Sequence, residues 1–228
     1  MRIATFNLES LDLPPKAKVP IEARIPVLRP QIQRLDADIL CLQEVNGQHI
    51  PGAPERQLAA LDEVLRDTPY ASFHRCATTG PGGHGVADVH NLVTLSRWPL
   101  ANIRQVRNDC VPALHYPPAT SADPAGGPLH LAFERPILIC DVDAPGGPLT
   151  VLNVHLRAPL ALPIPGQKLG PFVWKSTAAW AEGYALSAWK RAAQALESRI
   201  LVDRLFDEDP ARQILVTGDF NAEDHETP

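Results

Sequence analysis

The sequence predicts an α/β or α+β sandwich, in which helices pack on β-sheets around one core. Two observations carry this prediction. Short apolar runs of strand length alternate along the 228 residues with longer segments whose apolar residues repeat at helical spacing. Hydrophobic residues make up 45% of the chain, which is enough for a large buried core. Nothing inside the sequence has the composition of a linker, so we expect one domain over residues 1–228.

The N-terminal part of the chain is expected to alternate strand and helix. Strands are expected at residues 2–7 and 38–44, and helices at residues 22–35 and 54–66. Pro30 is expected to kink or divide the first helix, because proline lacks the backbone N–H that the helical ladder uses.

The remainder of the chain is expected to be rich in strands and to contain one long helix. The expected strands are residues 89–96, 103–107, 129–141, 149–154 and 213–217. The helix is expected at residues 178–206, with an apolar stripe formed by Trp189, Ala193, Leu196, Ile200 and Leu205. The polar residues that should lie largely off this stripe are Lys190, Gln194, Glu197 and Arg204.

Four of the apolar stretches lead into polar side chains of the kinds that bind metal ions or phosphate. These side chains are Asn7, Glu44, His155, and Asp219 with Asn221. One such strand end means little, because strands often finish in polar turn residues. Four of them, carrying amide, carboxylate and imidazole groups, form a candidate catalytic set. The sequence alone does not place these strand ends side by side.

Composition narrows the class of protein. A net charge of -5 argues weakly against broad, sequence-blind binding to polyanions. It does not exclude such binding, because an acidic protein can still carry a local basic patch. The four cysteines are widely spaced without a C-x-x-C pair, which favours core thiols in a reducing compartment over a zinc site or a disulfide framework. No apolar run approaches the roughly 20 residues of a membrane span, and no signal peptide is present. We therefore expect a cytoplasmic protein.

Seven short segments follow one another in a fixed order along nearly the whole chain. They are Ala4–Asn7, Asp38–Glu44, Leu95–Pro99, Glu134–Pro136, Asn153–Leu156, Lys190–Ala195 and Gly218–Ala222. The second resembles the D-I-x-x-L-Q-E signature of the endonuclease/exonuclease/phosphatase superfamily, which has a deoxyribonuclease I-like fold, and the last resembles its G-D-F-N-A signature. Each segment alone is weak, whereas the ordered set is a strong resemblance.

The resemblance implies a four-layer α-β-β-α sandwich of two face-packed mixed sheets flanked by helices. It also implies phosphoester hydrolysis at a divalent-metal site, with Mg²⁺ as the expected ion and Mn²⁺ as an alternative. The superfamily closes with a further strand and an S-D-H segment, which this sequence lacks; Asp224-His225-Glu226 follows G-D-F-N too closely to replace it. Either the sequence is a fragment or another chain supplies the remainder. We favour a truncated or cleaved product and expect a C-terminal segment of the same protein to supply the last strands and one catalytic histidine. The activity of the present fragment alone is left open.

The residue types suggest a division of labour. Glu44 is the expected metal ligand, with Asn7 beside it as a support or second ligand. Asp219 and Asn221 are two residues apart, so they should project to the same side of an extended backbone. One of them would orient or deprotonate the attacking water while the other donates a hydrogen bond. His155, by resemblance, faces the phosphate as a hydrogen-bond donor or an acid.

Other polar residues are weaker candidates. Arg135 is expected either to contact phosphate or to pair with Asp141 or Asp143, and Asn91 is a candidate for lining the cleft. Four histidines without metal-ligand spacing are expected in solvated loops, namely His84, His90, His115 and His130.

The leading hypothesis is a metal-dependent phosphoester hydrolase: a phosphodiesterase, a nuclease or a phosphatase. The substrate is a phosphate ester, either a small molecule or a nucleic acid. The alternative is a catalytically silent module of the same fold that binds a phosphorylated ligand. The number of metal ions and the oligomeric state are not determined by the sequence.

Overall fold

The structure is a computed structural model that describes residues 1–80 and 82–223. The Asp224-His225-Glu226 segment lies outside these residues. The chain divides into two compact units. The first consists of Met1–Val106, Arg135–His155 and Glu208–Asp219, and the second consists of Arg107–Glu134, Leu156–Asp207 and Phe220–Pro228. Whether these two units form the single domain that the sequence predicts is not tested by this division, and the single domain stays a prediction.

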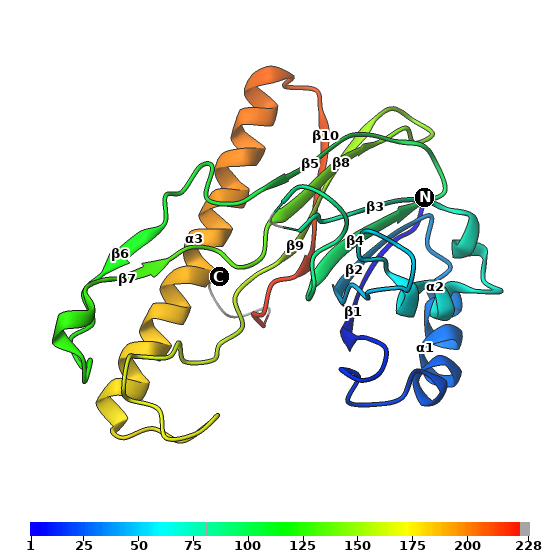
Figure 1. Cartoon of the computed structure of the whole chain (residues 1–228). Helices are drawn as coiled ribbons and strands as arrows, with labels where there is room; N and C mark the ends of the chain where they lie inside the picture. Colours follow the sequence, from blue (N-terminus) through cyan, green and yellow to red (C-terminus); the bar gives the residue numbers. More distant parts are fainter. Residues whose placement is uncertain (81, 224–228) are drawn as a thin grey trace. The chain divides into compact units, whose positions relative to one another are not determined.

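The first unit contains two mixed sheets of four strands each, which confirms the two mixed sheets implied by the resemblance (Figure 1). The first sheet has the order β1 (Ile3–Leu11), β2 (Ile39–Val45), β4 (Asn91–Ser96) and β3 (His74–Ala77). The second has the order β10 (Gln213–Asp219), β9 (Leu149–His155), β8 (Ile137–Val142) and β5 (Leu100–Val106). In each sheet one edge pair is parallel, β1 with β2 and β10 with β9, and the other pairings are antiparallel.

The two faces of the first sheet belong to two different cores. Because side chains alternate along a strand, Ile39 and Cys41 of β2 point to one face while Leu40 and Leu42 point to the other. Ile39 and Cys41 pack with the second sheet, in a cluster that includes Cys140. Leu40 and Leu42 pack with the helices α1 (Ile21–Leu35) and α2 (Ala59–Leu65). The first unit is therefore a face-packed sandwich with helices over the first sheet.

The second unit is built on the long helix α3 (Thr177–Glu208) and a two-stranded sheet of β6 (Leu114–Tyr116) and β7 (Leu129–Leu131). Two short 3-10 turns complete the chain, η1 (Pro69–Ser72) in the first unit and η2 (Pro124–Gly126) in the second. The second unit contains a core cluster of Leu131, Leu162, Ile164 and Leu186. Within the residues that the structure describes, no helix combines the length and apolar character needed to cross a membrane.

Two local expectations are wrong, and a third is wrong in part. Helix α1 is not divided at Pro30: it continues to Leu35, with Ile21 and Ile32 buried in the core. Helix α2 begins only at Ala59, since the chain before it pairs through Gln57 with Gln48 in an isolated bridge. The strand expected over 129–141 is two strands, β7 and β8.

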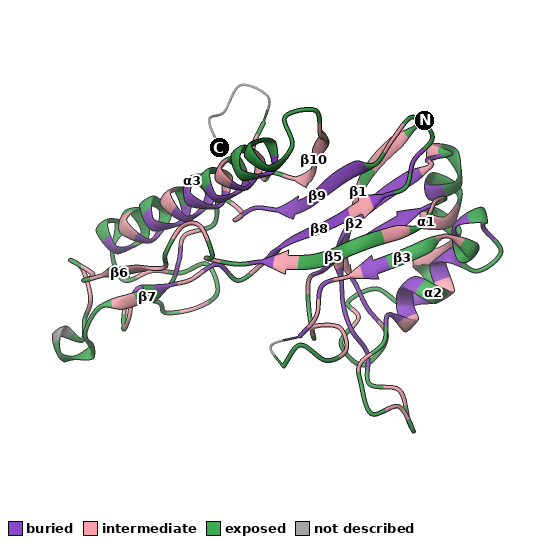
Figure 2. Ribbon diagram, turned by 90° about the horizontal axis from the view of Figure 1, so that it is seen from above, coloured by how far each residue is buried: buried purple, intermediate pink, exposed green. Residues whose placement is uncertain are grey.

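The expected stripe on α3 is only partly right: Ala193 and Leu205 are buried and Arg204 is exposed, as expected. Helix α3 carries both buried and exposed residues along its length (Figure 2). Against expectation, Lys190, Gln194 and Glu197 are buried, whereas Leu196 is 52% exposed. The buried polar groups hold loops of the same unit: Lys190 Nζ lies 2.7 Å from Glu134 Oε1, and Gln194 Oε1 accepts a hydrogen bond from the backbone N–H of residue 157 at 2.7 Å. A buried polar side chain is stable when it is hydrogen-bonded, so periodicity of apolar residues alone misassigned this face.

Candidate functional site

The polar strand ends of the first unit converge at one place. In β1 and β2, Asn7 pairs with Gln43, so that Glu44 is the next residue at the same end. In β10 and β9, Asp219 pairs directly with His155. The amide Nδ2 of Asn7 lies 2.7 Å from Asp219 Oδ2 and 3.4 Å from Glu44 Oε1. Two carboxylates from different sheets therefore share one amide group.

His155 is the fourth member of this cluster. Its Nε2 lies 3.5 Å from Asp219 Oδ2 and 3.7 Å from Glu44 Oε1, and its Nδ1 is buried without a hydrogen-bond partner. The pKa of His155 is lowered to about 4, chiefly by burial and further by the charge of Arg135, although the two carboxylates act in the opposite direction. The imidazole is therefore neutral at physiological pH.

Glu44 is held in place from the main chain. Its Oε2 accepts hydrogen bonds from the backbone N–H of Ser10 at 2.9 Å and from the Ser10 hydroxyl at 3.2 Å. Burial by itself raises the pKa of Glu44, but the hydrogen bond from Asn7, the nearby imidazoles of His155 and His90, and the Ser10 hydroxyl together lower it. Glu44 therefore stays ionised, which suits a metal ligand.

The two sheets are joined directly beneath the cluster. Gln43 Nε2 donates to Asn153 Oδ1 at 2.8 Å, and Asn153 Nδ2 donates to the carbonyl of Val93 at 3.1 Å. Gln43 and Asn153 are both buried, and each lies within two residues of a cluster member, Glu44 or His155. The glutamine of the D-I-x-x-L-Q-E segment and the asparagine of the N-x-H-L segment thus bring the strand ends of the two sheets together.

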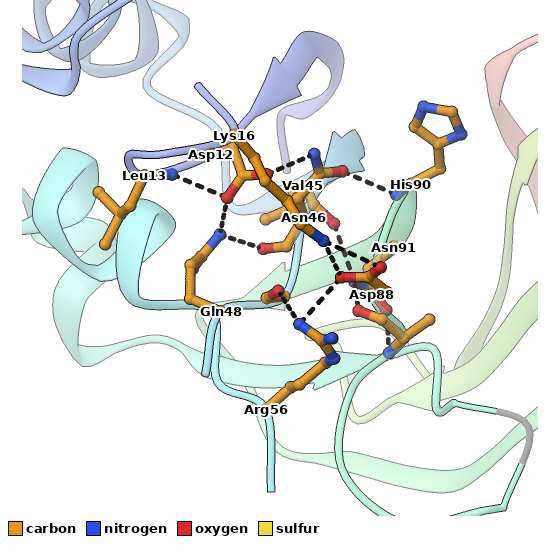
Figure 3. Close-up of polar contacts among 12 residues, drawn as sticks. Asp12, Leu13, Lys16, Val45, Asn46, Gln48, Arg56, Asp88, His90 and Asn91 are labelled. Atoms are coloured by element: carbon orange, nitrogen blue, oxygen red, sulfur yellow. Dashed lines mark hydrogen bonds and ion pairs between the residues drawn. The ribbon is translucent and has the colours of Figure 1, made fainter. Parts of the chain in front are cut away.

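A polar network around Asp12 fixes the loops beside the cluster (Figure 3). The buried Asp12 carboxylate accepts from Asn46 Nδ2 at 3.0 Å and from Gln48 Nε2 at 2.8 Å. Asn46 Oδ1 in turn accepts from the backbone N–H of His90 at 2.9 Å. His90 lies in a loop, as expected, but it is half-buried and close enough to Glu44 for the two side chains to influence each other's pKa. Burial and the charge of Arg135 lower the pKa of His90.

Asn91 belongs to the same network (Figure 3). Its oxygen accepts from Thr78 Oγ1 at 3.0 Å and from the N–H of Ala87 at 2.8 Å. Its NH₂ group donates to the carbonyls of Val45 at 2.9 Å and Ala87 at 2.8 Å. Asn91 is fully buried, and a contact with phosphate, as expected from the sequence, would require these bonds to break. That role stays a prediction.

Asn221 is not placed as its spacing from Asp219 suggested. Strand β10 ends at Asp219, and Asn221 has a φ of 50°, so the extended backbone assumed from the sequence does not continue to it. Asn221 belongs to the second unit, where its Nδ2 donates to the carbonyl of Leu156 at 2.9 Å. Its catalytic role stays a prediction.

Sequence reasoning missed Ser10 and His90. Ser10 follows the A-T-F-N segment by only three residues, and His90 directly precedes the strand that ends in L-S-R-x-P. Neither has a spacing that marks a metal ligand or a catalytic residue. Their importance comes from loops that the hydrogen-bond networks fold back toward Glu44.

The donor set is compatible with a hard divalent cation. Mg²⁺ is usually bound by one or two carboxylates, with waters and substrate phosphate completing its coordination, and Glu44 with Asp219 supplies that number of carboxylates. Asn7 turns its NH₂ group toward these carboxylates, because its oxygen accepts from the N–H of Glu9 at 2.8 Å. Among residues 1–80 and 82–223, no group of three or more His, Cys, Asp or Glu side chains is arranged to hold a metal by protein ligands alone.

Comparisons with solved structures support the same fold. Sphingomyelinase C from Streptomyces griseocarneus is similar with a TM-score of 0.59 and 16% identity, over 98% of this chain and 65% of that one. Truncated TDP2 from Caenorhabditis elegans has a TM-score of 0.57 and 16% identity, over 99% of this chain and 64% of that one. A longer form of TDP2 from C. elegans has a TM-score of 0.56 and 14% identity, over 99% of this chain and 49% of that one. The chain thus spans about half to two thirds of these structures.

A search of curated proteins by sequence gives no match. The sequence model of the Endonuclease/Exonuclease/phosphatase family, in contrast, matches residues 4–228. This match includes all of the strand ends that converge in the first unit. The chain belongs to the endonuclease/exonuclease/phosphatase family.

Proposed function

We propose that the protein is a phosphoester hydrolase that uses a divalent metal ion, Mg²⁺ or Mn²⁺. One observation carries the proposal: Asn7 and Asp219, 212 residues apart in sequence, are hydrogen-bonded at a point that Glu44 and His155 also reach. Membership of the family supports the reaction class. Two carboxylates beside a neutral imidazole provide the chemistry that attack of water on phosphorus requires.

Glu44 and Asp219 would hold the metal ion. When bound, it would stabilise the negative charge that develops on the phosphate and lower the pKa of a bound water. Asn7 orients both carboxylates through its NH₂ group, which makes it a support in this arrangement rather than a ligand. Asp219 remains the candidate for orienting or deprotonating the attacking water, and Asn221 the candidate for donating an amide hydrogen bond.

His155 is better suited to donate a hydrogen bond than to act as a general acid. A group with a pKa of about 4 is almost fully deprotonated at neutral pH, so it holds no extra proton to give to a leaving oxygen. A neutral imidazole still carries one N–H, which can stabilise a phosphate oxygen. Arg135, whose charge influences both His155 and His90, is the candidate cation for the phosphate.

The test is hydrolysis of an aryl phosphodiester by the full-length natural protein, with Mg²⁺, with Mn²⁺ and with excess chelator. Glu44→Gln and Asp219→Asn are each expected to lower kcat/KM by about 100-fold or more, because each removes a charge that the transition state needs. Glu63→Gln is the control, since Glu63 pairs with Arg66 on the surface of α2. Wild-type rates in both site variants, or unchanged activity in chelator, would refute the proposal.

The substrate class needs a separate comparison. Nicking of plasmid DNA and release of phosphate from small esters distinguish a nuclease from a phosphatase, and the net charge of -5 favours neither outright. The silent-module alternative predicts that the wild-type protein binds a phosphorylated ligand without turning it over under any of these conditions.

A further inference from the structure

A short backbone segment next to the carboxylate cluster has an unusual conformation. The pairing of β1 with β2 is interrupted between Asn7 and Leu11. Inside this bulge Glu9 has a φ of 46° and Ser10 a φ of 51°, which places two consecutive non-glycine residues in the left-handed region. Each such residue costs on the order of 1–2 kcal/mol. The surrounding structure must therefore stabilise this segment.

The bulge directs two successive N–H groups at the groups that build the site. The N–H of Glu9 donates to Asn7 Oδ1 at 2.8 Å, which turns the NH₂ of Asn7 toward the carboxylates. The N–H of Ser10 donates to Glu44 Oε2 at 2.9 Å. The orientations of Asn7 and Glu44 therefore both depend on the left-handed conformation of Glu9 and Ser10.

One arginine holds the bulge from the other side. Arg24, on α1, donates from Nη1 to the carbonyl of Glu9 at 3.1 Å and from Nη2 to the carbonyl of Leu8. Two adjacent carbonyls match the planar fork of a guanidinium group, which a lysine ammonium does not reproduce. Arg24 is half-buried, and its bond to the carbonyl of Leu8 is partly shielded from water.

We propose that Arg24 is a positioning residue for the active site: by clamping the carbonyls of Leu8 and Glu9, it fixes the Glu9–Ser10 bulge and through it Asn7 and Glu44. The effect on catalysis rests on the proposed function, whereas the effect on the bulge and on metal binding does not. Hydrogen-bonded partners of metal ligands typically change metal affinity by about 10- to 100-fold when they are lost, and the N–H of Ser10, whose direction Arg24 is proposed to fix, is such a partner of Glu44.

A competing role for Arg24 is direct contact with substrate. Arg24 lines a pocket of about 380 Å³ together with Ser10, Lys16, Lys18 and His90. If the guanidinium served this pocket, its loss would raise KM and leave the bulge unchanged. The two roles therefore differ in measurable quantities.

The chain offers a matched control on the same helix. Arg29 also lies on α1 and also donates to two consecutive carbonyls, Nη2 to Glu63 at 2.7 Å and Nε to Val64 at 3.2 Å, at the end of α2. Arg29→Lys removes the same kind of clamp without touching the bulge. Its loss of stability calibrates the purely structural effect of breaking such a fork.

The experiment compares Arg24→Lys with Arg29→Lys in the full-length natural protein. Mg²⁺ and Mn²⁺ affinities are measured by titration calorimetry, kcat and KM with an aryl phosphodiester, and the Glu9 and Ser10 amide signals by NMR. Arg24→Lys is expected to weaken metal binding by about tenfold, to lower kcat by about tenfold with little change in KM, and to shift both amide signals. Arg29→Lys should leave all of these at wild-type values.

Each other outcome overturns the proposal. Unmoved Glu9 and Ser10 amides with wild-type metal affinity would show that Arg24 does not position the site, and an increase confined to KM would assign it to the pocket. Equal losses of metal affinity in both variants would reduce the clamp to general stability. If wild-type protein is inactive, the proposed function fails, but the amide signals and metal titrations still decide the role of Arg24. Should Arg24→Lys fold poorly, Arg24→Gln, which cannot span both carbonyls with a planar fork, replaces it in the same measurements.

Discussion

The two sheets of the first unit each deliver one carboxylate to the site, but they hold it differently. Glu44, from the first sheet, is bound by the main-chain N–H and the hydroxyl of Ser10, and it has a φ of 58° itself. Asp219, from the second sheet, is the last residue of a regular strand. Its Oδ2 lies 2.7 Å from Asn7 Nδ2 and 3.5 Å from His155 Nε2. Glu44 is thus held by an irregular stretch of backbone, whereas Asp219 lies at the end of a regular strand and is contacted by side chains.

The difference shows where each sheet is strained. The first sheet reaches the site through a bulge, whereas β10 keeps its register with β9 up to Asp219. The second sheet is instead constrained at Gly218, where the strands approach closely. A change at Gly218, on the second sheet, should therefore act mainly on stability, whereas changes at Asn7 and Ser10, on the first, should act mainly on metal binding.

The largest effect is expected at the close approach in the second sheet. Gly218 has a φ of 143°, and a Cβ added there would lie 2.0 Å from the carbonyl oxygen of Val154. Gly218→Ala should lower the free energy of unfolding by about 2–6 kcal/mol, from overpacking and backbone strain together. Gly52→Ala is the control, because Gly52 also has a positive φ, 83°, but an added Cβ meets nothing within 4 Å. Equal losses in denaturant titrations would contradict the close-approach explanation.

The next largest loss of stability is expected for the hydrogen bond between Gln43 and Asn153, which links the two sheets. Gln43→Ala and Asn153→Ala each remove one partner of a fully buried hydrogen bond, so each should cost about 2–3 kcal/mol. Because the two residues are in contact, the double variant should cost less than the sum by about 1 kcal/mol. Additive losses in a double-mutant cycle would mean that the two sheets are held together independently of this pair.

Variants of Asn7 and Ser10 distinguish support of the carboxylates by a side chain from support by the main chain. Asn7→Ala removes the amide shared by both carboxylates, and we expect Mg²⁺ affinity to fall by about 10- to 100-fold. Ser10→Ala keeps the backbone N–H that holds Glu44 and should change the affinity by less than about threefold. A larger loss in Ser10→Ala than in Asn7→Ala, measured by calorimetry, would reverse the comparison.

The smallest effect concerns the pH dependence of stability. The folded state lowers the pKa of Glu44, so its ionised form stabilises the protein above the unfolded pKa of about 4.3. That contribution is lost as the pH falls through the lowered folded pKa. Without metal, Glu44→Gln should therefore lose less stability than wild type between neutral and acidic pH. A steeper acid dependence in the variant would contradict the direction of this shift.

Several features could be read from the sequence because they depend on local pattern. The apolar runs that form β1, β2 and β10 were recognisable, as were the polar residues that end them. The boundaries of α2 and the burial of Lys190 could not be read, because they depend on a bridge to Gln48 and on an ion pair with Glu134. These partners lie elsewhere in the chain, and no local pattern specifies them.

The sequence by itself determined the mixed α/β class, the family and the identity of the side chains at the strand ends. Only the tertiary structure decided that Asn7, Glu44, His155 and Asp219 meet, because this requires two sheets to pack with their parallel pairs ending at the same place. It also decided that Ser10 holds Glu44, since a left-handed bulge sets the direction of that N–H. Residue type fixes which chemistry is possible, and long-range packing fixes which groups are close enough to perform it.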